Sequence, residues 1–172
     1  MRLPAAVPTG ALATVTMDLA MVAVAELGGR AWASERLGLA PIGRWAAGLA
    51  EGRCRHDDIL SEAPRRGELA LGLLTHYTTG VLLVQAYLWL TRLAGRRPNV
   101  PGATAYGAAT AVLPLLVLYP SLGYGWFGLR SGEAGRLIRV MLLGHTAFGL
   151  GIGLWARRFT RNEADAAGPR RE

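Results

Sequence analysis

The stretch from Leu69 to Leu90 contains no charged side chain, and this feature restricts the possible folds of the chain more than any other. An α-helix rises about 1.5 Å per residue, so about 20 apolar residues cross the roughly 30 Å hydrocarbon core of a bilayer. Arg92, Arg96 and Arg97 follow directly, at the position where lipid headgroups accommodate cationic side chains. The stretch therefore predicts a membrane-spanning helix.

Three other stretches have a similar length and apolar content. The four predicted membrane helices cover about residues 10–27, 69–90, 103–122 and 137–156. Hydrophobic residues make up 51% of the chain and 23 of its 172 residues are glycine, more than a water-soluble domain of this size needs. We predict an all-α fold, an integral membrane four-helix bundle formed by residues 1–160, followed by a disordered polar tail at 161–172.

The first predicted helix carries an acidic residue, Asp18, near its middle. Insertion scales assign a cost of about 2.5–3.5 kcal/mol to an aspartate at the centre of a membrane helix. A cleaved signal peptide is the alternative interpretation, because Arg2 precedes the apolar run and Ala31, Trp32 and Ala33 resemble a cleavage site. An aspartate within the apolar region argues against a signal peptide, so we expect a membrane helix in which Asp18 has a buried polar partner.

The polar segment at 30–67 connects the first two predicted membrane helices. Four of its apolar residues recur at helical spacing: Ile42, Trp45, Ala46 and Leu49. This spacing predicts a short helix that lies in the membrane interface. Cys54, the only cysteine, lies in the same segment, so the chain has neither an internal disulfide nor a thiolate metal cage.

His56, Asp57 and Asp58 form a compact polar cluster further along this segment. Such a cluster suits a surface metal site or a general base that acts on a headgroup substrate. It lacks a recognised metalloenzyme spacing, so the favoured interpretation is a solvated loop in which Asp57 or Asp58 caps a turn.

All 19 basic residues are arginine, and the net charge is +7. Such a charge suits either a nucleic-acid-binding protein or a membrane protein. The arginines gather at the ends of apolar stretches, as Arg157 and Arg158 do, instead of forming a stripe along one helix, which favours headgroup contact. We expect the lipid bilayer as a partner and no nucleic acid, with both termini in the cytoplasm.

An internal similarity relates residues 73–81 to residues 142–150. Both segments read Leu, Leu, a small residue, His, three variable positions, Gly and an aliphatic residue. The similarity places His76 and His145 at comparable depth in two helices that run in the same direction. Glycines four residues from each histidine allow neighbouring helices to approach closely, so both histidines are expected to point into the bundle.

Asp18, His76 and His145 form the predicted intramembrane site, and Tyr77 and Thr14 are expected to support it. An intramembrane carboxylate beside an imidazole is able to exchange a proton with it. The alternative is a buried acid that fixes helix register through hydrogen bonds. For the histidines, three roles are open: interhelical hydrogen bonding, proton or ion handling, and ligation of haem or of a metal ion with Asp18 as a third ligand.

A set of short motifs in fixed order resembles a known family. The matching residues are Thr14, Met17, Asp18, Gly43, Arg44, Trp45, Gly52, Arg53, His56, Ile59, Gly67, Glu68, His76, Tyr77, Gly80, Pro120, Gly123, Gly125, His145, Phe148, Gly149 and Gly151. Over about residues 9–155 the chain resembles the small bacterial four-pass membrane proteins called domain of unknown function twenty-nine thirty-eight. The resemblance implies a multi-pass protein of the bacterial inner (cytoplasmic) membrane without an assigned activity.

Three functions therefore remain open. The first is an ion- or proton-coupled translocation or sensing module, expected to be a homo-oligomer or part of a membrane complex because four short helices enclose little space. The second is a membrane-embedded enzyme, or a haem or metal carrier that uses His76 and His145 as ligands. The third is a structural subunit of a membrane complex. No cofactor is required by the sequence, and none of the common catalytic motifs occurs.

Overall fold

The computed structural model describes residues 3–28 and 38–166 of the chain. These residues form helices and connecting loops without a strand, so the predicted all-α fold is confirmed for them. In chain order the elements are α1 (Leu3–Gly28), α3 (Leu39–Ala50), α4 (Glu68–Leu93), α5 (Val100–Thr110), η1 (Pro114–Leu118), α6 (Tyr119–Ser121), η2 (Trp126–Ser131) and α7 (Ala134–Ala166).

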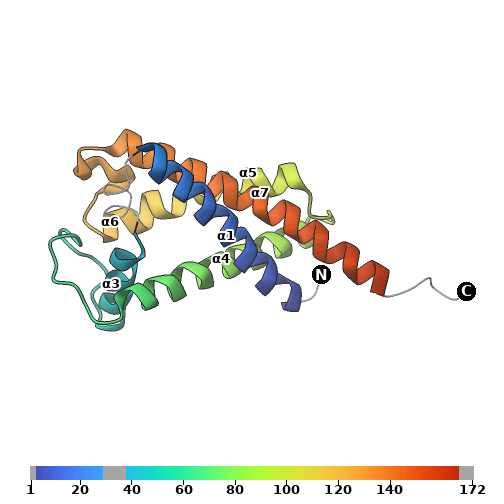
Figure 1. The fold of residues 1–172 in the computed structure, drawn as a ribbon, viewed down its shortest axis with the longest axis horizontal. Coiled ribbons are helices and arrows are strands. Elements are labelled where there is room, and N and C mark those ends of the chain that lie inside the picture. Colours follow the sequence, from blue (N-terminus) through green and yellow to red (C-terminus); the bar gives the residue numbers. More distant parts are fainter. Residues whose placement is uncertain (1–2, 29–37, 167–172) are drawn as a thin grey trace, which may run out of the picture.

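Four helical segments are long and apolar enough to cross a membrane, as predicted. They are Ala6–Leu27, Glu68–Leu93, Val100–Ser121 and Ala134–Phe159. Many long apolar side chains on them are exposed, for example Leu19 and Leu82, which suits a surface that faces lipid. Figure 1 shows the start of α1 and the end of α7 at the same end of the molecule. The chain is a multi-pass membrane protein.

The helices pack through glycines, as the sequence pattern predicts. A side chain at Gly107 of α5 would overlap the backbone of Gly149 in α7, and a Cβ atom at Gly151 would lie 2.9 Å from the Cα atom of Ala13 in α1. Small residues at such positions let helix backbones approach closely, so α7 lies against both α1 and α5. A side chain at Gly72 of α4 would likewise overlap the backbone of α3.

The third membrane segment is not a regular helix. Pro114 has no backbone N–H, so it cannot donate the hydrogen bond to Thr110 that an α-helix requires at this position. The helix accommodates the loss through the π-helical turn η1, followed by the short α6. Turns of this kind frequently occur at functional sites, and η1 forms one wall of the cavity described below.

The predicted helix in the first loop exists as α3. It packs against the beginning of α4, where a side chain at Gly43 would overlap the carbonyl group of Glu68. One prediction is wrong at the other end of the chain: α7 continues to Ala166, so residues 161–166, expected to belong to a disordered tail, are helical. The alternative cleavage site at 31–33 and residues 167–172 lie outside the described residues.

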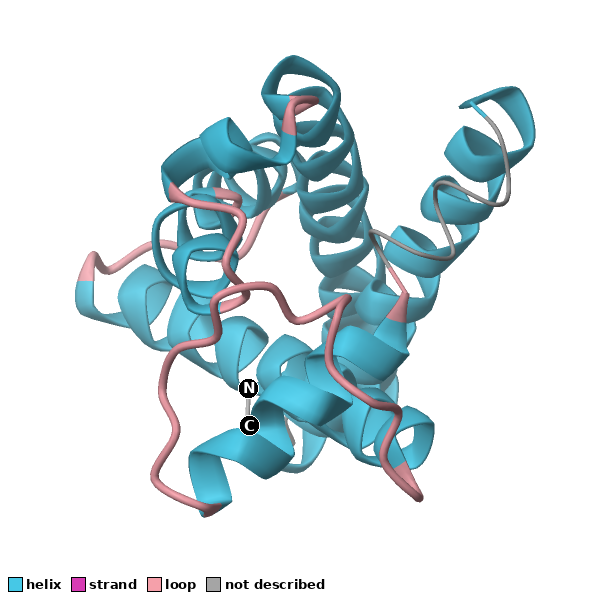
Figure 2. Cartoon of the chain, turned by 90° about the vertical axis from the view of Figure 1, so that its left-hand side faces the viewer, coloured by secondary structure: helices cyan, strands magenta, loops and turns pink. Residues whose placement is uncertain are grey.

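Residues 39–67, hereafter the cap, cover one end of the membrane helices (Figure 2). The backbone N–H groups of His56 and Ile59 donate to the carbonyl oxygens of Ser121 (2.8 Å) and Leu122 (3.0 Å). Gly123, with a φ angle of +93°, follows and touches the backbone of the cap so closely that a side chain would not fit. These contacts fix the cap to the end of the third membrane segment.

Candidate functional site

Asp18, His76 and Tyr77 form one hydrogen-bonded group within the membrane spans. The two carboxylate oxygens of Asp18 have separate partners: Oδ1 lies 2.9 Å from Nε2 of His76, and Oδ2 accepts a hydrogen bond of 2.9 Å from the Tyr77 hydroxyl. The side chain of Asp18 is 39% exposed and that of His76 is 18% exposed, so neither is sealed off. The structure thus brings together three of the residues that the sequence predicted for an intramembrane site.

This group exists because α1 and α4 approach closely just before it. Thr14 of α1 lies directly on Gly80 of α4, where any side chain would displace the threonine hydroxyl. Asp18 lies one turn after Thr14 on α1, and His76 lies one turn before Gly80 on α4. The Asp18 carboxylate therefore reaches both His76 and its neighbour Tyr77. Thr14 itself is buried and donates its hydroxyl hydrogen to the carbonyl of Gly10 (2.9 Å), so it sets the helix spacing and makes no hydrogen bond to Asp18.

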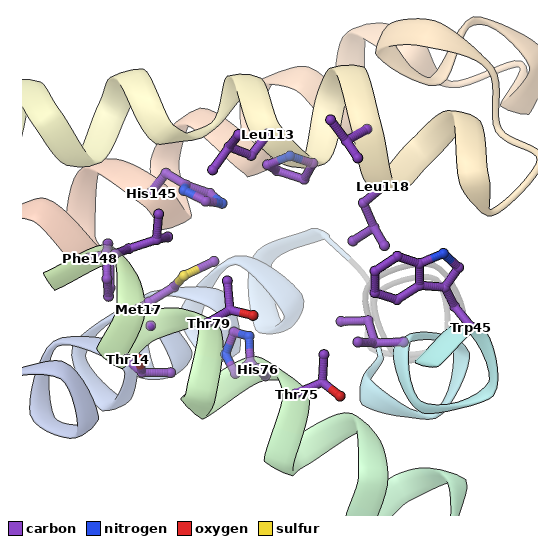
Figure 3. A pocket seen from close by; sticks show the side chains of 15 residues that line it. Thr14, Met17, Trp45, Thr75, His76, Thr79, Leu113, Leu118, His145 and Phe148 are labelled. Atoms are coloured by element: carbon purple, nitrogen blue, oxygen red, sulfur yellow. The ribbon is translucent and has the colours of Figure 1, made fainter. Parts of the chain in front are cut away.

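His145 does not join the Asp18 group. It lies on α7, is only 8% exposed, and its Nδ1 atom lies 2.9 Å from the hydroxyl oxygen of Thr110 on α5. Its ring nevertheless faces the same space as His76. Figure 3 shows the two rings on opposite walls, His145 above and His76 below. The three ionisable side chains that were expected to converge therefore do not all meet. Asp18 and His76 are hydrogen-bonded, and His145 lies across a cavity from them.

The cavity between these walls has a volume of about 300 Å³. It is lined by Thr14, Met17, Ile42, Trp45, Thr75, His76, Thr79, Gly80, Leu83, Leu113, Pro114, Val117, Leu118, His145 and Phe148. A second cavity of about 410 Å³ lies beside it, includes Asp18, and shares both histidines with the first. Since most of the lining is apolar, the two imidazoles, the Asp18 carboxylate and three threonines supply most of the polar chemistry.

The positions of the two histidines bear on the metal hypothesis. Among the described residues, no group of three or more His, Cys, Asp or Glu side chains is close enough to hold one metal ion. Asp18 therefore does not complete a three-ligand site with His76 and His145. His76 also engages Nε2 with Asp18, so a haem iron bound by both imidazoles through Nε2 would have to displace that hydrogen bond.

A second polar group lies in the cap, around Arg44. The Arg44 guanidinium is buried and forms paired hydrogen bonds of 2.9 and 3.0 Å with the Glu68 carboxylate. It also donates to the carbonyl oxygens of Ile59 (2.6 Å) and Glu62 (2.9 Å). The hydrogen bonds to Glu68 raise the pKa of Arg44 above its ordinary value. This arginine ties α3, α4 and the intervening loop together.

His56 is buried in the cap, contrary to the expectation of a solvated loop. Its Nδ1 atom forms a short hydrogen bond with the Glu62 carboxylate. Its Nε2 atom is buried without a hydrogen-bond partner among the described residues and would lie 2.8 Å from a Cβ atom on Gly48. The hydrogen bond with His56 lowers the pKa of Glu62. Asp57 and Asp58 are exposed, and Asp58 accepts a hydrogen bond from the Leu60 N–H (3.1 Å), which matches the predicted turn-capping role.

Three residues of these sites carried no predicted role. Thr110 holds His145 but stands in a run of small residues that resembles any helix-packing face. Trp45, which belongs to the predicted interfacial helix, also lines the cavity. Arg44 belongs to the family motifs, yet its partner Glu68 lies 24 residues away and only the fold brings the two together. Burial of an arginine is the structural signal that reveals such a pair.

The comparisons with known proteins identify a family but no activity. No curated protein and no solved structure matches the chain. A family model described as "Protein of unknown function (DUF2938)" matches residues 7–158, which is nearly the whole chain and includes every residue of both polar groups. The chain therefore belongs to this family of unknown function, DUF2938.

Proposed function

We propose that the chain is a multi-pass protein of the bacterial inner membrane in which Asp18 and His76 bind and release a proton, as part of a proton-coupled translocation or sensing module. One observation carries the proposal: the Asp18 carboxylate lies within a membrane span, bridges His76 and Tyr77, and lines a cavity. Ionisable groups at such depth are costly, and they occur mainly on ion and proton pathways.

The proton has a defined place in this group. An ionised Asp18 accepts hydrogen bonds from Tyr77 and from Nε2–H of His76, and His76 is neutral or cationic depending on Nδ1. Loading one proton onto the pair neutralises its charge, and releasing it restores the ionised carboxylate. The groups that face the pair from other helices are His145 on α7 and Tyr119 on α6. Since neither is ordinarily charged at neutral pH, the proton remains with the pair.

The partners follow from the surface of the helices. The exposed apolar side chains on α1 and α4 suit contact with lipid or with another membrane protein. We propose a homo-oligomer or a membrane complex, because Asp18 remains 39% exposed on a helix whose outer face is apolar. Neighbouring protein would shield that carboxylate from acyl chains. No role in nucleic-acid binding is proposed.

Infrared difference spectroscopy of the purified full chain in lipid tests proton binding directly. When the pH of the sample is changed, we expect a carboxyl band and an imidazole band that change together. Both changes should disappear in Asp18→Asn. Asp57→Asn is the matched control, because Asp57 is exposed in the cap and should leave the bands unchanged. If the wild-type bands persist in Asp18→Asn, the proposal is wrong.

Proteoliposomes separate translocation from sensing. With an imposed pH gradient and an internal pH dye, translocation predicts a proton flux in the wild type and in Asp57→Asn but not in Asp18→Asn. A wild type without flux that still shows the infrared bands would support sensing. Equal flux in the wild type and Asp18→Asn would exclude translocation through this pair. A variant that loses only stability would indicate the structural role that the sequence also allows.

A further inference from the structure

The hydrogen bonds around His145 define which of its ring nitrogens carries the proton. The hydroxyl of Thr110 has a single hydrogen, and its 2.6 Å contact with the carbonyl oxygen of Gly107 uses that hydrogen. The same hydroxyl oxygen lies 2.9 Å from Nδ1 of His145 and must therefore accept, so Nδ1 carries the proton. Neutral His145 thus has an unprotonated Nε2 atom.

This Nε2 atom is an unsatisfied hydrogen-bond acceptor. His145 is more than nine-tenths buried, and Nε2 has no hydrogen-bond partner among the described residues. The ring lines the 300 Å³ cavity and is directed into it (Figure 3). Because this atom is not sealed by protein, a molecule in the cavity can reach it, and an O–H group on that molecule would donate a hydrogen bond to it.

The remaining walls define the rest of the ligand. Large apolar surfaces come from Trp45, Leu83, Leu113, Leu118 and Phe148. A cavity of about 150 Å³ lined by apolar side chains binds benzene, so about 300 Å³ accommodates roughly two fused aromatic rings or an aliphatic body of similar size. No arginine or lysine lines the cavity to balance a negative charge on a ligand.

We propose that this cavity binds a small, uncharged, mostly apolar molecule that carries one hydroxyl group, and that this hydroxyl donates a hydrogen bond to Nε2 of His145. Phenols and short alcohols have this chemistry. The inference rests on the proposed function, because it names the class of molecule that would bind beside the Asp18–His76 pair when that pair takes up or releases a proton. Its geometry depends on His145 and Thr110, not on Asp18.

The test compares two probes of equal shape that differ in one group. Binding of 2-naphthol and of 2-methylnaphthalene to the full chain in detergent is measured by saturation-transfer NMR and by the shift in Tm. Because both probes partition into micelles, affinities are compared between protein variants at the same detergent concentration. In the wild type we expect 2-naphthol to bind about tenfold more tightly, the effect of one hydrogen bond.

Two variants remove the acceptor in different ways. His145→Phe keeps a ring in the wall but has no nitrogen, so the preference for 2-naphthol should fall to about one. Thr110→Val removes the group that holds the proton on Nδ1 and lets it move to Nε2, which can then only donate to the weakly accepting phenolic oxygen, so the preference should fall while the histidine remains. Thr110→Val keeps the test valid if His145→Phe does not fold, as judged by circular dichroism and gel filtration.

The outcomes separate this inference from the proposed function. Asp18→Asn should retain the preference for 2-naphthol, since Asp18 does not touch the acceptor. Equal binding of the two probes to the wild type, absence of binding, or a preference that survives in both His145→Phe and Thr110→Val would overturn the ligand assignment. None of these results would alter the infrared or flux measurements on Asp18, so each proposal can fail without the other.

Discussion

The cap and the intramembrane site each contain a carboxylate paired with a cationic or imidazole side chain, but their hydrogen bonding differs. Arg44 uses four of its five N–H donors, and its partner Glu68 is only 12% exposed. Asp18 is 39% exposed and lines a cavity together with His76. The first group is enclosed and nearly saturated, whereas the second is open on one side.

This difference in hydrogen-bond saturation and access bears on what each polar group can do. A saturated, enclosed network stabilises one arrangement of the chain and has no free donor or acceptor for a ligand. A network with free positions beside a cavity contributes less to stability and is available for a proton or a small molecule. Variants of the enclosed group should therefore mainly reduce stability, whereas variants of the open group should mainly reduce the binding of a proton or a small molecule.

The largest effect on stability is expected from Arg44→Ala. Removing the guanidinium leaves the Glu68 carboxylate without its main partner and two carbonyl groups without a donor, at a cost of about 3–5 kcal/mol. Thermal unfolding followed by circular dichroism measures the loss. Arg66→Ala, at an exposed position of the same cap, serves as the control and should change stability by less than about 0.5 kcal/mol. Equal effects of the two variants would contradict the assigned role of Arg44.

Gly48→Ala should have a smaller effect. A Cβ atom at this position would lie 2.8 Å from Nε2 of His56, whose ring is buried and held by Glu62. Overpacking of this kind costs about 1–3 kcal/mol and exceeds the gain of up to about 1 kcal/mol from replacing a helical glycine. Gly135→Ala in α7 has space for the methyl group, so it should leave stability unchanged or raise it. A stabilising Gly48→Ala would show that His56 moves freely.

The pH dependence of the cap is the next smaller effect. Because the hydrogen bond with His56 lowers the pKa of Glu62 in the folded chain, its contribution to stability is present above the unfolded value of 4.5 and is lost as the pH falls through the folded value. The wild type should therefore lose more stability than Glu62→Gln on acidification from about pH 6 to pH 3, by on the order of 1 kcal/mol. Parallel unfolding curves for the two proteins would exclude this linkage.

Local patterns in the sequence predicted the fold well. Hydropathy and the prolines and arginines at the helix ends identified four membrane helices, and the spacing from Ile42 to Leu49 predicted α3. These features depend on short-range chemistry, namely the length of an apolar run and the period of a helix. The predicted end of α7 was wrong because polar composition at 161–166 does not prevent a long helix from continuing past the membrane.

The candidate site was predictable in part for the same reason. A carboxylate and two histidines in apolar runs are costly wherever they lie, so composition alone singles them out. Their pairing was not predictable, since Asp18 meets His76 through the close approach of α1 and α4 at Gly80, while His145 meets Thr110 through the approach of α5 and α7. Which helices approach is decided by packing over the whole chain. The burial of His56, a residue of the same type in the cap, was missed for this reason as well.

Apart from the control variants, Asp18→Asn should have the smallest effect on stability of the changes considered. Asparagine retains an oxygen that accepts from Tyr77 or His76, and interhelical hydrogen bonds in membrane proteins contribute only about 0.6 kcal/mol on average. A loss below about 1 kcal/mol, measured by unfolding in mixed micelles, combined with the disappearance of the infrared bands would separate the chemical role of Asp18 from a structural one. A loss comparable to that of Arg44→Ala would instead mean that both groups fix the fold, because only a saturated network depends so strongly on one member.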